Sequence, residues 1–362
     1  MHSRRLAITI VVACVLSSAP AHGEFTTVVN VPPGTIPPGA LFGANTQVNL
    51  HLGAAATLGD VLHLGGFNAP AENAELNVLG GSAWSIEAWT GSQLNVVAGS
   101  VGGANLLGGR GTMSGGAVNY WTLFSNSSLE MSGGIATHVD TAGSTEGDDP
   151  NSSSFLITGG TVGVLDATGN ATIQGGSVAT FFFRGGGFVD VSGGSTGDDF
   201  EVGSVVTGAL PDDPTREIVV GSGGRVAVSG GSIGQRMMLR SGRTLDYSGG
   251  AIGDAFHAFE GSQVNVRGSQ FLLDGVALNL GASEELVIAQ RGVTLEGVLA
   301  DGLPFRFDLN GEIGQRDYFS QGAMLSIISV PEPATLVLSG LGILITLLLR
   351  RAGVSATTPR QS

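Results

Sequence analysis

Paired acidic residues are the feature of this 362-residue chain best suited to chemistry. Two carboxylates that converge on one groove can cleave a polysaccharide, or can bind it together with Ca²⁺. The pairs are Asp148-Asp149, Asp198-Asp199, Asp212-Asp213 and Glu284-Glu285. The first and third lie in polar insertions, where solvated loop side chains are the simpler interpretation. Asp198 occupies the same position in a repeat as Asp254, which indicates a turn residue rather than a catalytic acid.

Metal ligands and nucleophile motifs give weaker signals. The six histidines are scattered, and His51 and His63, twelve residues apart, have no third candidate ligand nearby. No G-x-S-x-G, H-E-x-x-H or phosphate-binding loop occurs. The stretch FFFRGGGF (181–188) indicates a buried strand with a glycine corner, with an aromatic binding patch as the alternative. We therefore expect no catalytic, metal or cofactor site.

A repeated phrase occupies the chain between residues 50 and 270: an apolar-polar-apolar triplet followed by a glycine turn. The second turn glycine recurs at steps of mostly 16 to 19 residues. The step from Gly194 to Gly231 is about two periods long, which predicts one degenerate copy around residues 203–223. The clearest copies are ELNVLGGS (75–82), QLNVVAGS (93–100), FVDVSGGS (188–195), RVAVSGGS (225–232) and TLDYSGGA (244–251).

In each copy apolar and polar residues alternate, as they do in a β-strand with one buried face. In the first copy Leu76 and Val78 point one way and Asn77 the other; Asp246 is likewise expected to point outward. A unit of about 18 residues cannot bury its apolar face alone, so the copies must stack with their strands ~4.8 Å apart. The pattern predicts an all-β fold, a parallel β-solenoid, with an antiparallel β-sandwich as the alternative.

The composition narrows the class of partner. The chain has 60 glycines, 13% charged residues and a net charge of −14. All basic residues are arginine, and five of the sixteen lie near the two ends. A body this acidic repels nucleic acids and anionic lipid surfaces, so we expect no nucleic-acid partner.

The N-terminus is built like a secretory signal peptide. Arg4 and Arg5 precede an apolar stretch (6–16), and small residues follow it up to Gly23. We expect a signal helix that is removed on export. Cys14, the sole cysteine, lies inside this segment, and a lipid attached to it remains a lesser alternative.

The C-terminus has three parts in a fixed order. As a helix, the apolar run would be about 24 Å long, short against a hydrocarbon core of about 30 Å. The arginines place the chain end in the cytoplasm and the repeats outside. The parts are Pro331, Glu332 and Pro333, then the apolar run 334–349, then Arg350 and Arg351.

This order resembles the PEP-CTERM sorting signal of Gram-negative and planctomycete bacteria. The three residues 331–333 match the motif, the apolar run matches its transmembrane helix, and the two arginines match its basic end. The resemblance implies processing by an exosortase and delivery to the cell surface or its exopolysaccharide matrix. The glycine-rich body is also similar to repeat-bearing surface proteins of planctomycetes.

Together these features predict a chain of six segments and a non-enzymatic function. We expect a structural or adhesive rod at the cell surface, with an exosortase and surface glycans as partners and a single C-terminal membrane helix before processing. The alternatives are a polysaccharide-binding module and a polysaccharide-active β-helix enzyme. The segments are a signal peptide (1–23), a lead-in or cap (24–49), solenoid repeats (50–270), a C-terminal β cap (271–328), the sorting signal (329–353) and a cytoplasmic trailer (354–362).

Overall fold

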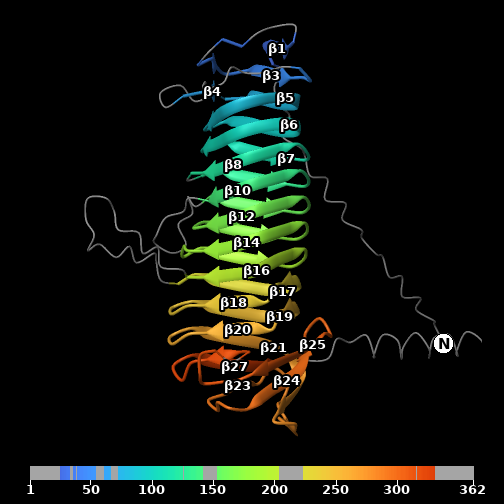
Figure 1. Ribbon diagram of the computed structural model, residues 1–362, viewed down its shortest axis with the longest axis vertical. Coiled ribbons are helices and arrows are strands. Elements are labelled where there is room, and N and C mark those ends of the chain that lie inside the picture. Colours follow the sequence, from blue (N-terminus) through green and yellow to red (C-terminus); the bar gives the residue numbers. More distant parts are fainter. Residues whose placement is uncertain are drawn as a thin grey trace, which may run out of the picture.

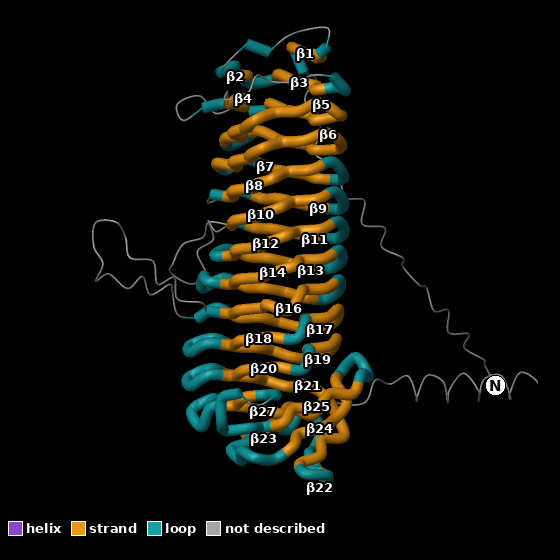
Figure 2. Tube along the Cα trace, in the orientation of Figure 1, coloured by secondary structure: helices purple, strands orange, loops and turns teal. Residues whose placement is uncertain are grey.

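The computed structural model shows a long rod made of stacked β-strands (Figure 1). Every regular element in the described part of the chain is a strand, and the strands belong to one continuous sheet (Figure 2). The predicted signal peptide, the acidic pairs at 148–149 and 212–213 and the sorting tail from residue 331 lie outside this part. The described residues are 25–32, 36–37, 39–53, 61–66, 72–124, 126–141, 153–203, 223–314 and 316–330.

A coil of the rod consists of a short strand, a glycine turn, a longer strand and a second turn. Equivalent strands of successive coils pair in parallel, so two ladders run along the rod. The first ladder contains β1 (Thr27–Val31), β3 (Thr46–Leu50), the first parts of β5 (Ala74–Trp89) and β6 (Ser92–Leu107), β7 (Arg110–Met113), β9 (Ser128–Met131), β11 (Ser154–Ile157), β13 (Asn170–Ile173), β15 (Phe188–Val191), β17 (Arg225–Ile233), β19 (Thr244–Ile252), β21 (Gln263–Leu273) and β27 (Met324–Ser329). The second ladder contains β2 (Leu41–Phe42), β4 (Val61–Leu64), the later parts of β5 and β6, β8 (Ala117–Leu123), β10 (Ile135–Thr141), β12 (Thr161–Ala167), β14 (Ser177–Phe183), β16 (Ser195–Val202), β18 (Arg236–Leu239), β20 (Ala255–Ala258) and β26 (Tyr318–Phe319).

The core consists of files of apolar side chains that stack from coil to coil. In one file Val228, Tyr247, Val266 and Ile327 are in direct register, and each is at most 3% exposed. The parallel pairing and the buried files confirm the predicted solenoid. Asp246 lies in the outward file with Asn265, as the alternation predicts, but it is only 7% exposed because Arg225 and Asn265 enclose its carboxylate.

Side-chain size is balanced across the core where the largest residue lies. Trp121, on the second ladder, is fully buried. Gly111 takes the inward position of the first ladder beside it, where a Cβ would stand only 3.0 Å from the Trp121 ring and from the side chains of Leu106 and Leu129. The glycine therefore makes room for the indole, as close packing of a core requires.

Backbone conformation and lack of space each require glycine at the turns. Gly176 has φ +70°, a left-handed conformation that costs other L-residues about 1–2 kcal/mol. A Cβ at this position would also lie 2.7 Å from the carbonyl oxygen of Gly160, the equivalent glycine of the preceding coil. The spacing of the coils thus leaves no volume for a side chain at this turn.

Gly176→Ala is therefore expected to lower the free energy of unfolding by at least about 1–2 kcal/mol, because strain and steric overlap add. Gly103→Ala is the matched control, since φ there is not in the left-handed range and a Cβ would meet only the Ser85 hydroxyl at 3.8 Å. Thermal denaturation of both variants is the measurement. Equal losses would contradict the argument from close stacking.

The predicted degenerate copy around residues 203–223 is wrong. β15 pairs directly with β17, with Phe188 opposite Arg225, and β16 pairs directly with β18, with Asp199 opposite Arg236. Consecutive rungs are therefore in contact across this step, and no coil lies between them. Residues 204–222 themselves lie outside the described part.

The two ends of the rod differ. At the C-terminal end β24 (Thr294–Leu299) runs antiparallel to β21 and to β25 (Pro304–Asp308), and β23 (Glu285–Val287) runs antiparallel to β27. A short β22 (Val276–Ala277) folds back on β21. β26 and β27 then return to the parallel ladders, so one further coil lies within the segment predicted as a cap. At the N-terminal end β1 pairs with β3 alone among the described strands.

Candidate functional site

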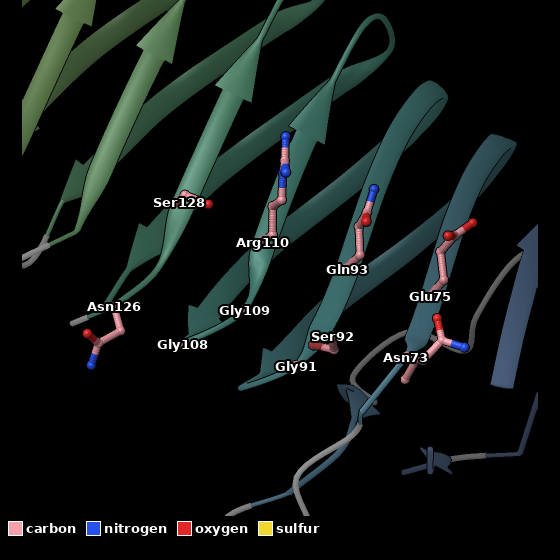
Figure 3. A pocket seen from close by; sticks show the side chains of 11 residues that line it. Asn73, Glu75, Gly91, Ser92, Gln93, Gly108, Gly109, Arg110, Asn126 and Ser128 are labelled. Atoms are coloured by element: carbon pink, nitrogen blue, oxygen red, sulfur yellow. The ribbon is translucent and has the colours of Figure 1, made fainter. Parts of the chain in front are cut away.

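Two adjoining hollows lie on the outer side of the first ladder. One, of about 290 Å³, crosses the starts of β5, β6, β7 and β9 (Figure 3). The other, of about 330 Å³, continues over β9, β11 and β13 as far as Gln174. Arg110 and Ser128 line both hollows, so the two form one trough along the rod, here called the first-ladder trough.

The register of the strands and the sizes of the side chains produce this trough. Long side chains flank the second of the two hollows, Arg110 on one side and, beyond its lining, Phe188, which is 41% exposed. The positions between them carry Ser128, Ser154 and Asn170, which are short and leave the space open. Phe188 follows in the same file, since its backbone N–H donates to the Asn170 side chain at 2.9 Å. Four strand spacings separate Arg110 from Phe188, about 19 Å.

The trough offers mainly neutral hydrogen-bonding groups. In Figure 3 the side chains of Glu75, Gln93 and Arg110 project from successive strands. Arg110 Nη2 lies 3.4 Å from Glu130 Oε2, and both side chains are about half exposed, so the ion pair contributes little to stability. Asn170, Thr172 and Gln174 line the far half. Amides and hydroxyls can both donate and accept hydrogen bonds.

A ladder of asparagine side chains runs beside the trough on the outer side of the first ladder, over the strands nearest the N-terminal end. The Asn49 amide donates to Asn30 at 2.9 Å, Asn77 donates to Asn49 at 2.9 Å, and Asn95 donates to Asn77 at 2.8 Å. The Thr112 hydroxyl donates to Asn95 at 2.7 Å. These bonds hold the outer side chains in fixed orientations beside the trough.

An acidic pair that sequence reasoning missed lies on the second ladder. Asp140 and Asp166 occupy the same position in adjacent coils. Burial raises the pKa of both carboxyls, and Arg184 opposes the change in both. Arg184 Nη2 is 3.1 Å from Asp166 Oδ2, while Asp166 Oδ1 and Arg184 Nε are buried without a hydrogen-bond partner. The acids are far apart in sequence, so a search for adjacent acids does not find them.

Asp140→Asn is expected to raise the melting temperature at pH 7. Burial raises the Asp140 pKa above 3.8, so the folded state favours the protonated form. Stability from this group is full below the unfolded-state pKa and is lost as pH rises through the folded-state pKa. The amide avoids that loss, so the gain over wild type should shrink as the pH falls towards 4 or below. Thermal denaturation across this range is the measurement, and a lower melting temperature at pH 7 would contradict it.

The acids singled out in the sequence are placed as turn and surface residues. Asp198 accepts a hydrogen bond from the backbone N–H of Gln235 at 3.2 Å, and Asp254, two coils further on, pairs with Arg316. Asp199 pairs with Arg236. Glu284 accepts from the backbone N–H of Gly281 at 2.6 Å, within its own loop.

The histidine and aromatic candidates also have local partners. His63 Nδ1 lies 3.0 Å from Glu87 Oε2 on the next coil. Within the described ranges, no group of three or more His, Cys, Asp or Glu side chains is arranged to hold a metal. In the FFFRGGGF stretch Phe181 and Phe183 are buried, and Phe188 at its end is exposed.

The C-terminal segment begins at the last strand of the rod. Ser329 ends β27, and the backbone N–H of Val330 donates to the carbonyl of Gly268 at 2.8 Å, so the segment leaves directly from the last rung. Residues 329–352 match the family model of the PEP-CTERM protein-sorting motif. The segment is a PEP-CTERM motif. The matched range contains all the predicted motif residues, Pro331, Glu332, Pro333, Arg350 and Arg351.

The PEP-CTERM motif implies that the protein is exported and sorted to the cell surface by an exosortase. No curated protein and no solved structure matches the chain significantly. The predicted membrane helix lies in the PEP-CTERM tail, outside the described residues. Among the residues that the structure describes, no helix is long and apolar enough to cross a membrane.

Proposed function

We propose that the protein is a structural and adhesive rod of the cell surface or extracellular matrix, and that it adheres by binding a polysaccharide in the first-ladder trough. The observation that carries this proposal is the trough itself, a hollow with amide and hydroxyl side chains that follows the rod axis across successive coils. Equivalent positions recur at each strand spacing of about 4.8 Å. An extended polymer laid along the axis therefore meets a polar side chain at each rung.

The lining favours a neutral, hydroxyl-rich glycan. The trough presents amides and hydroxyls. Its guanidinium at Arg110 is paired with Glu130, and its carboxylate at Glu75 accepts from the side-chain amides of Gln47 and Asn77. The chain carries a net charge of −14, which repels acidic polysaccharides. Phe188 adds an apolar ring at one end, against which the face of a sugar can pack.

Binding is tested by filling the trough. Ser154→Arg places a long side chain at its centre, whereas Thr244→Arg adds the same side chain in the same outward file beyond the trough. Retention of each exported chain on neutral polysaccharides from the host envelope, together with a glycan array, is the measurement. We expect at least tenfold weaker binding for Ser154→Arg and wild-type binding for Thr244→Arg. Wild-type chain that binds no neutral glycan, or equal loss in both variants, overturns the proposal.

We also propose that the protein does not transform the glycan. Asp166 is paired with Arg184, and neither Asp140 nor Asp166 lines the trough. The exported chain should therefore release no reducing ends and no unsaturated products from neutral or acidic polysaccharides. Turnover that disappears in Asp140→Asn or Asp198→Asn would establish a polysaccharide-active enzyme instead.

A further inference from the structure

The N-terminal end of the rod presents an open strand edge. In the β1–β3 pair the backbone N–H of Thr27 donates to the carbonyl of Asn45 at 3.2 Å, and the carbonyl of Val31 accepts from His51 at 2.8 Å. Alternate residues of a strand direct their main-chain groups to the same neighbour. The N–H and C=O groups of Val28 and Asn30 therefore point away from β3, and no described strand pairs with them.

The strands at the same end carry no charged side chain. No Asp, Glu, Lys or Arg occurs between Glu24 and Asp60, in a chain whose net charge is −14. Apolar side chains are exposed there, with Val28 at 53% and Leu41 at 62%. Soluble proteins usually protect an edge strand with lysine, proline or a bulge. The five residues of β1, TVVNV, contain no charge and no proline, and their pairing with β3 has no register shift.

At the opposite end the first ladder is covered. β23 pairs antiparallel with β27, the last strand of that ladder, so copies cannot add head to tail through it. Figure 1 shows β1 at one end of the rod and β27, which leads into the sorting motif, at the other. Because the first ladder is uncovered at its N-terminal end and covered at the other, it permits a closed two-fold contact between identical ends.

We propose that two copies of this chain join end to end through β1. The two β1 strands run antiparallel about a two-fold axis near Val29, so that Val28 of one copy and Asn30 of the other exchange their main-chain hydrogen bonds. An axis perpendicular to the sheet keeps Val29 and Val31 on the inner side in both copies, and the apolar core continues across the junction. The product is a rod of double length with a sorting motif at each outer end. Like charges repel two copies elsewhere on their surfaces, whereas residues 25–59, which include β1, carry no charged side chain.

The test is the mass of the exported chain in solution, by light scattering and sedimentation at micromolar concentration. Wild type should have twice the mass of one chain. Val28→Pro should be monomeric yet folded, because it removes an N–H that β3 does not use, as an edge strand tolerates. Val28→Lys should also be monomeric. Val276→Lys is the matched control, an equally apolar residue, 67% exposed at the capped end, and it should remain dimeric.

The proposed register of the two β1 strands can be tested separately by disulfide formation. An equimolar mixture of Val28→Cys and Asn30→Cys chains should form a disulfide between copies under mild oxidation, since these positions face each other across the junction. A monomeric wild type, a dimer that persists in Val28→Pro, or a wild type that pairs only with some other component each overturns the proposal. The glycan-binding proposal is unaffected by these outcomes, because the trough lies on the side of the rod.

Discussion

Replacing Val266 with aspartate is expected to lower the free energy of unfolding by roughly 3 kcal/mol or more, enough to unfold several coils. Val266 is fully buried between Tyr247 and Ile327 in the stacked file, and no cation lies in that file to pair with a carboxylate. The acid must either remain protonated or expose the core to water. Thermal and denaturant unfolding followed by circular dichroism measure the loss.

The outward neighbour supplies the control, with one restriction that the structure adds. By alternation alone Asn265→Asp is a mild change, but the Asn265 amide donates to Asp246 at 3.1 Å, and a second carboxylate there would face a buried one. Asn265→Thr avoids this repulsion, and its hydroxyl can still donate to Asp246. It should cost less than about 1.5 kcal/mol, because it loses only the bond that Asn265 accepts from Gln263 at 3.0 Å. Comparable losses in Val266→Asp and Asn265→Thr would contradict the assignment of inner and outer faces.

Replacing Pro331, Glu332 and Pro333 together with alanine is expected to abolish sorting. Proline cannot continue a helix, so we expect a processing enzyme to reach the motif before the apolar run. Wild-type protein at the cell surface should lack the run 334–349, whereas the variant should keep it and fractionate with the membrane. Intact mass and membrane fractionation of both forms in the native host are the measurements.

A change in the trailer is the matched control for this prediction. Alanine at Thr357, Thr358 and Pro359 alters the same tail beyond the range that matches the motif, so processing should continue. Recovery of the wild-type chain whole, with its C-terminal peptide through Ser362, would show that the tail is a permanent anchor. Loss of sorting in both variants would show that the tail length matters and the motif does not.

The fold could be predicted because it is encoded locally and then repeated. One strand with two inward residues, such as Val226 and Val228, determines the inner file of every coil once the turn glycines are aligned. The chain length between turn glycines predicts the number of coils less reliably. The step from Gly194 to Gly231 has the length of two coils, yet Phe188 pairs directly with Arg225. Spacing alone cannot distinguish a coil from an insertion.

The candidate site could not be predicted to the same degree, because it depends on neighbours across coils. The trough exists because Ser128, Ser154 and Asn170 are shorter than Arg110 and Phe188, a comparison that needs the register. Asp140 and Asp166 meet only because β10 and β12 pair across the intervening insertion. Sequence reasoning placed the sorting motif correctly because its parts are contiguous.

Register between coils has a consequence for how this protein can change. β9 pairs directly with β11, and β15 with β17, although the chain between β10 and β11 and between β16 and β17 is longer than an ordinary turn. Hydrogen bonds join each rung to the rung of the adjacent coil, so they set no limit on the length of the connection. Both long connections follow a second-ladder strand, at the same corner of the coil. We therefore expect this corner to accept new sequence, such as an inserted peptide tag, while every rung stays paired.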